Sequence, residues 1–178
     1  LHLSIRRQRQ MCIRDSLNDA HEENPALGLR GLRALRASED ILREQLTALA
    51  EASAATEADL WVMAPMVATV EETEYFTALA REYGLKTAGV MVEIPSSALL
   101  ADRILAHADF ASIGTNDLTQ YTMAADRMLG SVAGFQDPWP PAVLRLVREV
   151  GTEGARLGKP VGICGEAAAD PMLSLIHI

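Results

Sequence analysis

Residues 110–127 read Phe-Ala-Ser-Ile-Gly-Thr-Asn-Asp-Leu-Thr-Gln-Tyr-Thr-Met-Ala-Ala-Asp-Arg, an apolar run that leads directly into a cluster of polar side chains. The apolar part is typical of a buried strand, and Asn116 and Asp117 stand just beyond its end. Parallel α/β sheets present their catalytic groups at this position. Arg127 follows after a short helical turn, from which its guanidinium can reach back to clamp an anion. The stretch therefore predicts a parallel strand that leads into a polar binding site.

Three more apolar runs are expected to form strands of the same sheet. The four predicted strands are 59–64, 89–94, 109–114 and 160–164. The stretches between them predict helices at 69–83, 97–107 and 142–157. A further helix is expected over 38–54, with Ser38 as its cap. Strands that are apolar on both faces and alternate with amphipathic helices indicate parallel βα units.

Both an open doubly wound sheet and a barrel satisfy this alternation. In an open sheet only the strands next to the switch point end in functional residues, whereas a barrel gathers all its strand ends around one site. Here the predicted strands end in chemically distinctive residues, which are 63–66, Glu93, Asn116 with Asp117, and 164–166. We therefore expect an α/β fold, a partial (β/α)8 TIM barrel with about four to five βα units present.

The two ends of the chain are expected to be foreign to the domain. Residues 11–16 and 173–178 can be encoded by DNA sequences that are reverse complements of each other, as a sequencing adapter read on both sides of an insert would be. We predict that 1–16 and 173–178 are adapter-derived and not native, and that 17–172 is a partial domain of a longer gene product. The alternative is a basic arm or targeting segment with an apolar tail, but no apolar stretch follows the arginines at 6–9 as a signal peptide requires.

Charge and composition argue against several classes of partner. The net charge is −8, and without residues 1–16, which hold four arginines and one aspartate, it becomes −11. This acidic balance argues against nucleic acid and anionic lipid, and no apolar run is long enough for membrane insertion. Because Cys12 lies in the excluded segment, Cys164 is the single thiol of 17–172, as expected in a reducing, cytoplasmic compartment.

A set of motifs in this order resembles phosphoenolpyruvate-using enzymes. The motifs are Asn-Pro-Ala-Leu-Gly-Leu-Arg-Gly-Leu-Arg at 24–33, Met-Ala-Pro-Met-Val at 63–67, Gly-Val-Met-Val-Glu-Ile-Pro at 89–95, the stretch 112–127, and Ile-Cys-Gly-Glu at 163–166. The ending Tyr-Thr-Met-Ala-Ala-Asp-Arg at 121–127 resembles Enzyme I of the sugar phosphotransferase system in particular. Dikinases and phosphoenolpyruvate synthases look similar only as far as Gln120, and a fragment of one of these is the alternative.

The resemblance implies roles for a small set of residues. It implies Mg²⁺ bound by Glu93 and Asp117, phosphate held by Arg30, Asn116 and Arg127, and Cys164 as the catalytic acid that protonates the enolate to give pyruvate. Each has an ordinary alternative: a solvated carboxylate, a surface arginine, an asparagine that caps a turn, or a buried cysteine. One position departs from the family. Trp61 stands where other members have arginine, so a phosphate-binding arginine is either missing there or replaced by packing.

The implied function is phosphoryl transfer by a transferase. An enzyme of this family moves the phosphoryl group of phosphoenolpyruvate to an active-site histidine and on to a phosphocarrier protein, releasing pyruvate during sugar uptake. The resemblance places that histidine and the carrier contact in an N-terminal domain outside this chain, and it implies a homodimer for the full-length protein. The isolated chain is therefore predicted to be inactive and poorly folded. The alternative from another class is a catalytically silent scaffold that binds phosphoenolpyruvate or dimerises.

Overall fold

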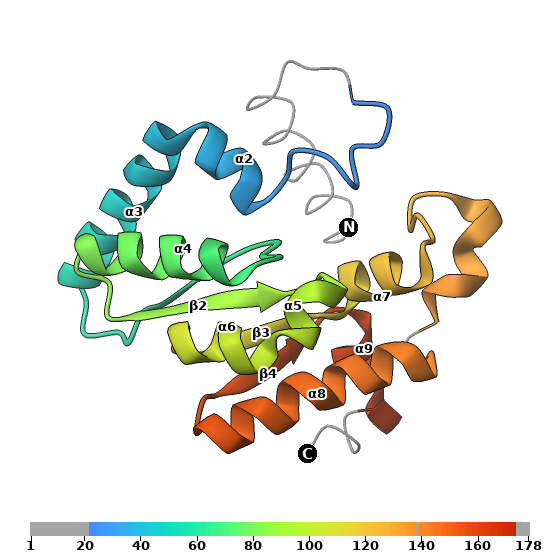
Figure 1. Ribbon diagram of the computed structural model, residues 1–178. Coiled ribbons are helices and arrows are strands. Elements are labelled where there is room, and N and C mark those ends of the chain that lie inside the picture. The colour runs from blue at the N-terminus through green and yellow to red at the C-terminus, as the bar shows by residue number, and fades with distance from the viewer. Residues whose placement is uncertain (1–21, 138, 174–178) are drawn as a thin grey trace.

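The computed structural model describes residues 22–137 and 139–173. Within them, four strands form one parallel sheet in the sequential order β1-β2-β3-β4. The strands are β1 Trp61–Ala64, β2 Thr87–Val92, β3 Ala111–Gly114 and β4 Val161–Cys164. Helices connect successive strands (Figure 1). This arrangement is the α/β fold that the sequence predicts, a partial (β/α)8 barrel.

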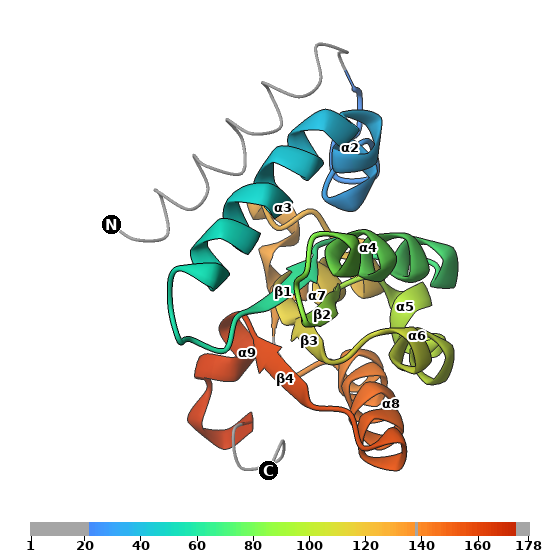
Figure 2. The same cartoon turned by 90° about the vertical axis from the view of Figure 1, so that its left-hand side faces the viewer.

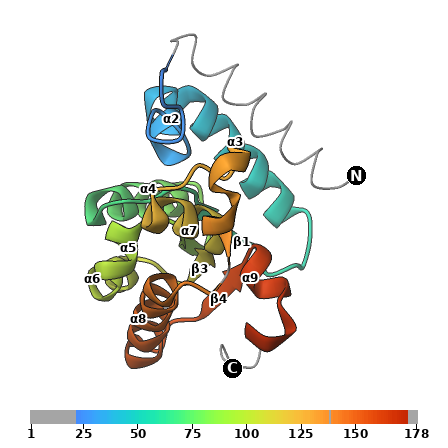
Figure 3. The ribbon, with the colours of Figure 1, turned by 90° about the vertical axis from the view of Figure 1, so that its right-hand side faces the viewer.

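Three of the helices, α4, α6 and α8, cover one face of the sheet. The helices of the described residues are α2 Leu32–Ala37, α3 Glu39–Ala54, α4 Val70–Glu82, α5 Pro95–Leu99, α6 Ala101–His107, α7 Thr115–Met123, α8 Pro141–Leu157 and α9 Glu166–Ala169, with a 3-10 helix η1 at Gly130–Gln136. Helix α6 packs against both α4 and α8, and these three form the outer layer of the curved sheet (Figure 2, Figure 3). The carboxyl ends of the strands lead into α5, α7 and α9.

Local sequence signals set the ends of α4 and α8. Thr69 Oγ1 accepts a hydrogen bond from the Glu72 amide, and the Glu72 carboxylate accepts one from the Thr69 amide, which forms the predicted capping box. Gly158 adopts φ +64 after α8 and provides the predicted left-handed cap. Ser38 does precede α3, but its side chain makes no capping hydrogen bond, and α2, which the sequence analysis did not predict, comes before it.

Two differences from the predicted elements lie next to the strand that Glu93 follows. The helix expected over 97–107 is two helices, α5 and α6, which meet at Leu100. Strand β2 ends earlier than predicted, at Val92, and Ile94 is already the N-cap of α5, which begins at Pro95. Glu93 therefore lies just beyond its strand rather than inside it.

The two faces of the sheet differ in what covers them. Side chains alternate between the faces, and the face beneath the helices is buried, with residues Val62, Ala64, Ala88, Val90, Val92, Ala111 and Ile113. The opposite face carries Trp61 and Met63, which are 46% and 42% exposed. The Trp61 ring packs on Phe110 with 4.8 Å between ring centroids, so Trp61 has an aromatic packing partner on this face. In a complete barrel this face is the interior, which side chains of the other strands fill.

The predicted foreign ends lie almost entirely outside the described residues. Residues 1–16 and 174–178 belong to that undescribed part, so the adapter hypothesis stays a prediction there. Leu173 is buried, but it is not a member of the main hydrophobic core cluster among the described residues. None of the helices in the described part of the chain has the length and apolar character needed to cross a membrane.

Candidate functional site

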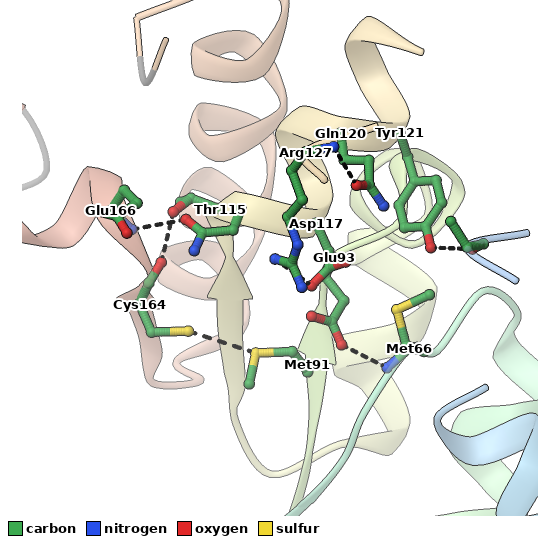
Figure 4. A network of polar contacts seen from close by, with 12 residues as sticks. Met66, Met91, Glu93, Thr115, Asp117, Gln120, Tyr121, Arg127, Cys164 and Glu166 are labelled. Atoms are coloured by element: carbon green, nitrogen blue, oxygen red, sulfur yellow. Dashed lines mark hydrogen bonds and ion pairs between the residues drawn. The ribbon is translucent and has the colours of Figure 1, made fainter. Parts of the chain in front are cut away.

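Polar side chains converge at the carboxyl ends of the strands. Glu93 follows β2, Asp117 lies in the first turn of α7 directly after β3, and Cys164 ends β4. Arg30 comes from the loop before α2, and Arg127 comes from the segment after α7. Figure 4 shows Arg127, Asp117 and Glu93 gathered at this end of the sheet.

Asp117 is a buried carboxylate that holds two arginines. The residue is 6% exposed, its Oδ1 lies 3.3 Å from Arg30 Nη2, and its Oδ2 lies 3.2 Å from Arg127 Nη1. The arginine side chains are themselves largely shielded, with 19% and 26% exposed. A guanidinium carries five N–H donors, so each arginine retains donors for a further anion. The site presents two oriented positive groups at one point.

Glu93 is the second buried carboxylate, and it fixes the loop after β1. Its Oε1 accepts a hydrogen bond from the Met66 amide at 2.8 Å. Burial and, to a smaller extent, the negative charge of Asp117 raise the pKa of Glu93, and the Met66 hydrogen bond and the positive charges of Arg30 and Arg127 oppose them, with a net pKa of about 7. Met66 adopts φ +58, a left-handed conformation that residues other than glycine rarely take. Glu93 thus stabilises a strained turn beside the site.

The two carboxylates fit a divalent cation that is shared with a phosphate. The charge of Asp117 is one cause of the raised pKa of Glu93, so a bound cation would relieve an existing repulsion. Among residues 22–137 and 139–173, no group of three or more His, Cys, Asp or Glu side chains could hold a metal ion. Mg²⁺ usually takes one or two carboxylates and completes its shell with water and phosphate oxygens. These residues therefore fit Mg²⁺ together with a phosphorylated ligand, and do not form an all-protein cage.

Asn116 and Thr115 join the end of β3 to the loop after β4. Asn116 Oδ1 accepts a hydrogen bond from the Glu166 amide at 2.8 Å, and Thr115 Oγ1 donates to the Cys164 carbonyl at 2.7 Å. Gly165 has φ +92, and a Cβ there would come within 2.5 Å of Thr115 Oγ1. Because its oxygen is engaged, Asn116 has its amide nitrogen left to donate to a ligand, and that nitrogen makes no hydrogen bond within the described part of the chain.

A cavity of about 200 Å³ opens beside this junction. Its lining consists of Thr115, Asn116, Thr119, Arg127, Gln136, Glu166 and Ala167. Of the residues predicted to surround one cavity, only Asn116 and Arg127 line this one. Asp117 does not line the cavity, but its carboxylate pairs with Arg127, which does, and also with Arg30. Asp117, Arg30 and Arg127 therefore form a connected network that extends beyond the cavity, and the predicted residues do not all surround one cavity.

Cys164 lies apart from the arginine–carboxylate network. Its half-buried thiol is 3.7 Å from both Met91 Sδ and Ser112 Oγ, and 3.5 Å from the Ile113 carbonyl oxygen. Figure 4 shows it on the far side of Met91 from Glu93. The thiol thus lies on the face of the sheet opposite the outer helices, the concave face that also carries Trp61 and Met63. Among the described residues it contacts neither of the two arginines.

Two residues of α7 that the sequence analysis did not single out support the arginines. Gln120 Oε1 accepts a hydrogen bond from the Arg127 amide at 2.9 Å, and Tyr121 Oη accepts one from Arg30 Nη1 at 2.8 Å. Side chains three and four positions after Asp117 share its face of a helix. A helical interpretation of the whole stretch after β3 would therefore have found both residues.

Comparison with known proteins defines the class of this chain. Residues 5–178 match the family described as PEP-utilising enzyme, PEP-binding domain. The chain therefore belongs to the family of phosphoenolpyruvate-utilising enzymes. The match extends past both predicted boundaries, at residues 17 and 172, and these boundaries stay a prediction.

Particular relatives narrow the class further. The chain is 52% identical over 163 residues to the phosphoenolpyruvate-protein phosphotransferase of Streptomyces coelicolor, with 91% of the chain covered. It is 45% identical to the proteins of the same name from Geobacillus stearothermophilus and Bacillus subtilis, with 85% and 84% covered. These phosphotransferases are the Enzyme I group that the motifs resemble, so the predicted resemblance is confirmed. The chain spans 28% to 29% of the length of these relatives.

Proposed function

We propose that this chain supplies the phosphoenolpyruvate-binding part of a phosphotransferase of the Enzyme I type. The observation that carries the proposal is the pair of guanidinium groups that Asp117 holds at the strand ends, those of Arg30 and Arg127. Phosphoenolpyruvate carries a phosphate and a carboxylate. A planar guanidinium fork matches the oxygens of either group in a bidentate way that lysine cannot.

Each polar group of the network has a distinct task in this proposal. Arg30 and Arg127 hold oxygens of the substrate with the donors that Asp117 leaves free, and the Asn116 amide nitrogen adds a neutral donor. Glu93 and Asp117 would hold Mg²⁺, which when bound would neutralise part of the negative charge on the phosphate. Because phosphoryl transfer depends mainly on positioning and charge stabilisation, such a network is sufficient for the substrate side of the reaction.

Cys164 is the proposed acid of the second chemical event. Loss of the phosphoryl group leaves the enolate of pyruvate, whose methylene carbon must take up a proton. The thiol would give its proton to that carbon, and the resulting thiolate would regain a proton from solvent. The position of the thiol on the concave face, next to Met91, supports access from the barrel interior.

The remaining steps belong to parts of the parent enzyme outside this chain. The phosphoryl group would pass to a histidine in another domain and from there to a phosphocarrier protein, and the parent barrel would act as a homodimer. The chain spans only 28% to 29% of its phosphotransferase relatives, and alone it should not catalyse the complete reaction.

Two other functions compete with this proposal. A dikinase or synthase would use a similar barrel, but the 52% identity to a named phosphotransferase favours the latter. A silent scaffold would need no intact chemistry, whereas here two buried carboxylates and two shielded arginines are present together. A purely structural ionic cluster of this kind seldom repays its desolvation, which favours a ligand-binding site over a scaffold that only dimerises; a silent scaffold that binds phosphoenolpyruvate differs from this proposal in lacking phosphotransfer.

The proposal can be tested in a chimera in which residues 17–172 replace the homologous segment of the Streptomyces coelicolor phosphotransferase. With phosphoenolpyruvate and Mg²⁺, the chimera should phosphorylate its carrier protein and release pyruvate. Arg30→Ala should reduce kcat/KM at least about 100-fold, because it removes a charge-assisted contact to the substrate.

The matched control is Arg43→Ala. Arg43 pairs with Glu39 and Glu82 on the surface of α3 and α4, away from the strand ends, so its loss should leave the kinetics unchanged. A folded chimera without phosphotransfer would favour the silent scaffold. A chimera that is active and equally insensitive to both substitutions would contradict the assigned site.

A further inference from the structure

The hydroxyl of Tyr121 joins two segments that are distant in the sequence. It accepts a hydrogen bond from Arg30 Nη1 at 2.8 Å, and it donates its own proton to the carbonyl oxygen of Ala26. Ala26 belongs to residues 24–29, which we call the entry loop. One hydroxyl of α7 therefore binds both the entry loop and the arginine that follows it.

The backbone around Arg30 is already held, so the orientation of its side chain is the open question. Gly31 adopts φ +57 against Met66, where a Cβ would lie 2.5 Å from Met66 Cβ, and the Leu32 amide donates to the Pro65 carbonyl. These contacts fix where the side chain begins. They do not fix the plane of its guanidinium group.

Two acceptors on one face of α7 determine that plane. Asp117 Oδ1 lies 3.3 Å from Nη2 of Arg30, and Tyr121 Oη binds Nη1. With the carboxylate alone, the guanidinium could rotate about a single contact. With both acceptors, two of its nitrogens are engaged and the remaining donors face a defined direction.

The Tyr121 hydroxyl must keep its proton in order to donate to Ala26, and its surroundings favour the protonated form. Burial raises the pKa of the phenol, the positive charge of Arg30 lowers it, and the negative charge of Asp117 raises it again, with a net upward shift. The hydroxyl thus keeps its proton at neutral pH and can donate to Ala26 while it accepts from Arg30.

We propose that Tyr121 is a positioning residue for phosphoenolpyruvate binding, which docks the entry loop on α7 and orients the guanidinium of Arg30 toward the substrate. This inference rests on the proposed function, because it assigns Arg30 to the substrate. It also makes a claim that does not depend on the substrate, namely that the entry loop is held in place through the Tyr121 hydroxyl.

The test removes only that hydroxyl, by Tyr121→Phe in the chimera. The KM for phosphoenolpyruvate should rise about tenfold, as expected for loss of a hydrogen bond to a charged group, while kcat changes less than about twofold. In an Arg30→Ala background the same substitution should have no further effect on kcat/KM, because Tyr121 acts through Arg30. Tyr83→Phe is the matched control, since Tyr83 accepts a hydrogen bond from Arg43 on the outer surface.

A second measurement follows the loop without substrate. Amide hydrogen exchange at residues 27–29 should be faster in Tyr121→Phe than in the parent chimera and unchanged in Tyr83→Phe. An unchanged KM, or an effect of equal size with and without Arg30, would overturn the positioning role. Unchanged exchange would overturn loop docking. If the parent chimera fails to use phosphoenolpyruvate, the proposed function fails, and the exchange result still decides whether Tyr121 holds the loop.

Discussion

Asp117 is the residue on which the geometry of the site depends most. Its two oxygens each face a different arginine, and the residue is 6% exposed. Removing one member of a buried ionic cluster leaves the other charges unpaired, and this lowers the stability of the folded protein more than removing the whole cluster does. Asp117 should therefore be the most sensitive single position of the network.

Asp117→Asn keeps the size of the side chain and removes its charge. In the chimera it should lower the free energy of unfolding by about 2 kcal/mol, less than for a fully buried pair, because both arginines keep some contact with solvent. It should also reduce kcat/KM for phosphoenolpyruvate at least about 100-fold. Denaturant unfolding and steady-state kinetics measure the two effects. Asp102→Asn, at an exposed position of α6, is the control, and equal effects at both positions would refute this assignment.

Glu93 should make stability depend on pH. Its pKa is raised from an ordinary 4.5 to about 7, so between these values the folded protein binds a proton that the unfolded chain has lost. Stability without Mg²⁺ should therefore fall as pH rises from about 4.5 to about 7, by on the order of 3 kcal/mol at most, and then level off. Mg²⁺ favours the ionised carboxylate and should oppose this fall.

Denaturant unfolding of the chimera at pH values from about 5 to about 8, with a chelator or with Mg²⁺, measures this dependence. Glu93→Gln cannot titrate and should remove this part of the pH dependence. If the same fall persists in Glu93→Gln, it arises from other groups, and the environment assigned to Glu93 is wrong.

At the residue scale, the sequence could name site residues but not their contacts. Glu93 and Asp117 follow apolar runs, so their place at strand ends was predictable from the pattern. Arg30 and Asp117 are 87 positions apart, and only the family resemblance connected them before the fold was known. The bond from the Met66 amide to Glu93 could not be predicted, because every residue except proline offers the same donor.

At the scale of elements, the loop after β4 depends on a glycine. Gly165→Ala should strain the backbone at φ +92 and force the new Cβ against Thr115 Oγ1, which disturbs the bonds to Cys164 and Asn116. We expect a loss of about 1 to 3 kcal/mol in stability and a fall in kcat/KM. Thermal and denaturant unfolding of the chimera measure the loss.

A second glycine provides the control for that substitution. Gly151 lies in α8 with nothing near an added Cβ, so Gly151→Ala should be neutral or stabilise by up to about 1 kcal/mol through helix propensity. If Gly165→Ala were as harmless as Gly151→Ala, the loop after β4 would not be held as described.

The elements that were predicted well carry their own local signals. The capping box at Thr69 and the cap at Gly158 are encoded in short-range chemistry, and both are confirmed. The division of the helix at Leu100 has no such signal, since no glycine or proline stands there. Packing of α5 against β2, α7 and α8 and of α6 against α4 and α8 accompanies this break, and such contacts are not visible in a local sequence pattern.

At the scale of the whole molecule, the concave face of the sheet is incomplete. Trp61 and Met63 are 46% and 42% exposed where a barrel interior would bury them. The 178-residue chain expressed alone should therefore unfold without a sharp cooperative transition, and phosphoenolpyruvate with Mg²⁺ should give little stabilisation. Scanning calorimetry with and without both ligands tests this. A sharp transition at a temperature that both ligands raise together would show that this chain folds and binds without further strands.

The central claim is that residues of this chain bind phosphoenolpyruvate through the network around Asp117. Isothermal titration of the chimera with phosphoenolpyruvate, with and without Mg²⁺, tests it most directly. We predict one saturable site that Mg²⁺ strengthens, that Arg127→Ala weakens at least about 100-fold, and that Arg43→Ala leaves unchanged. A chimera that melts cooperatively but binds no phosphoenolpyruvate, or binds it equally well after Arg127→Ala, would contradict the claim.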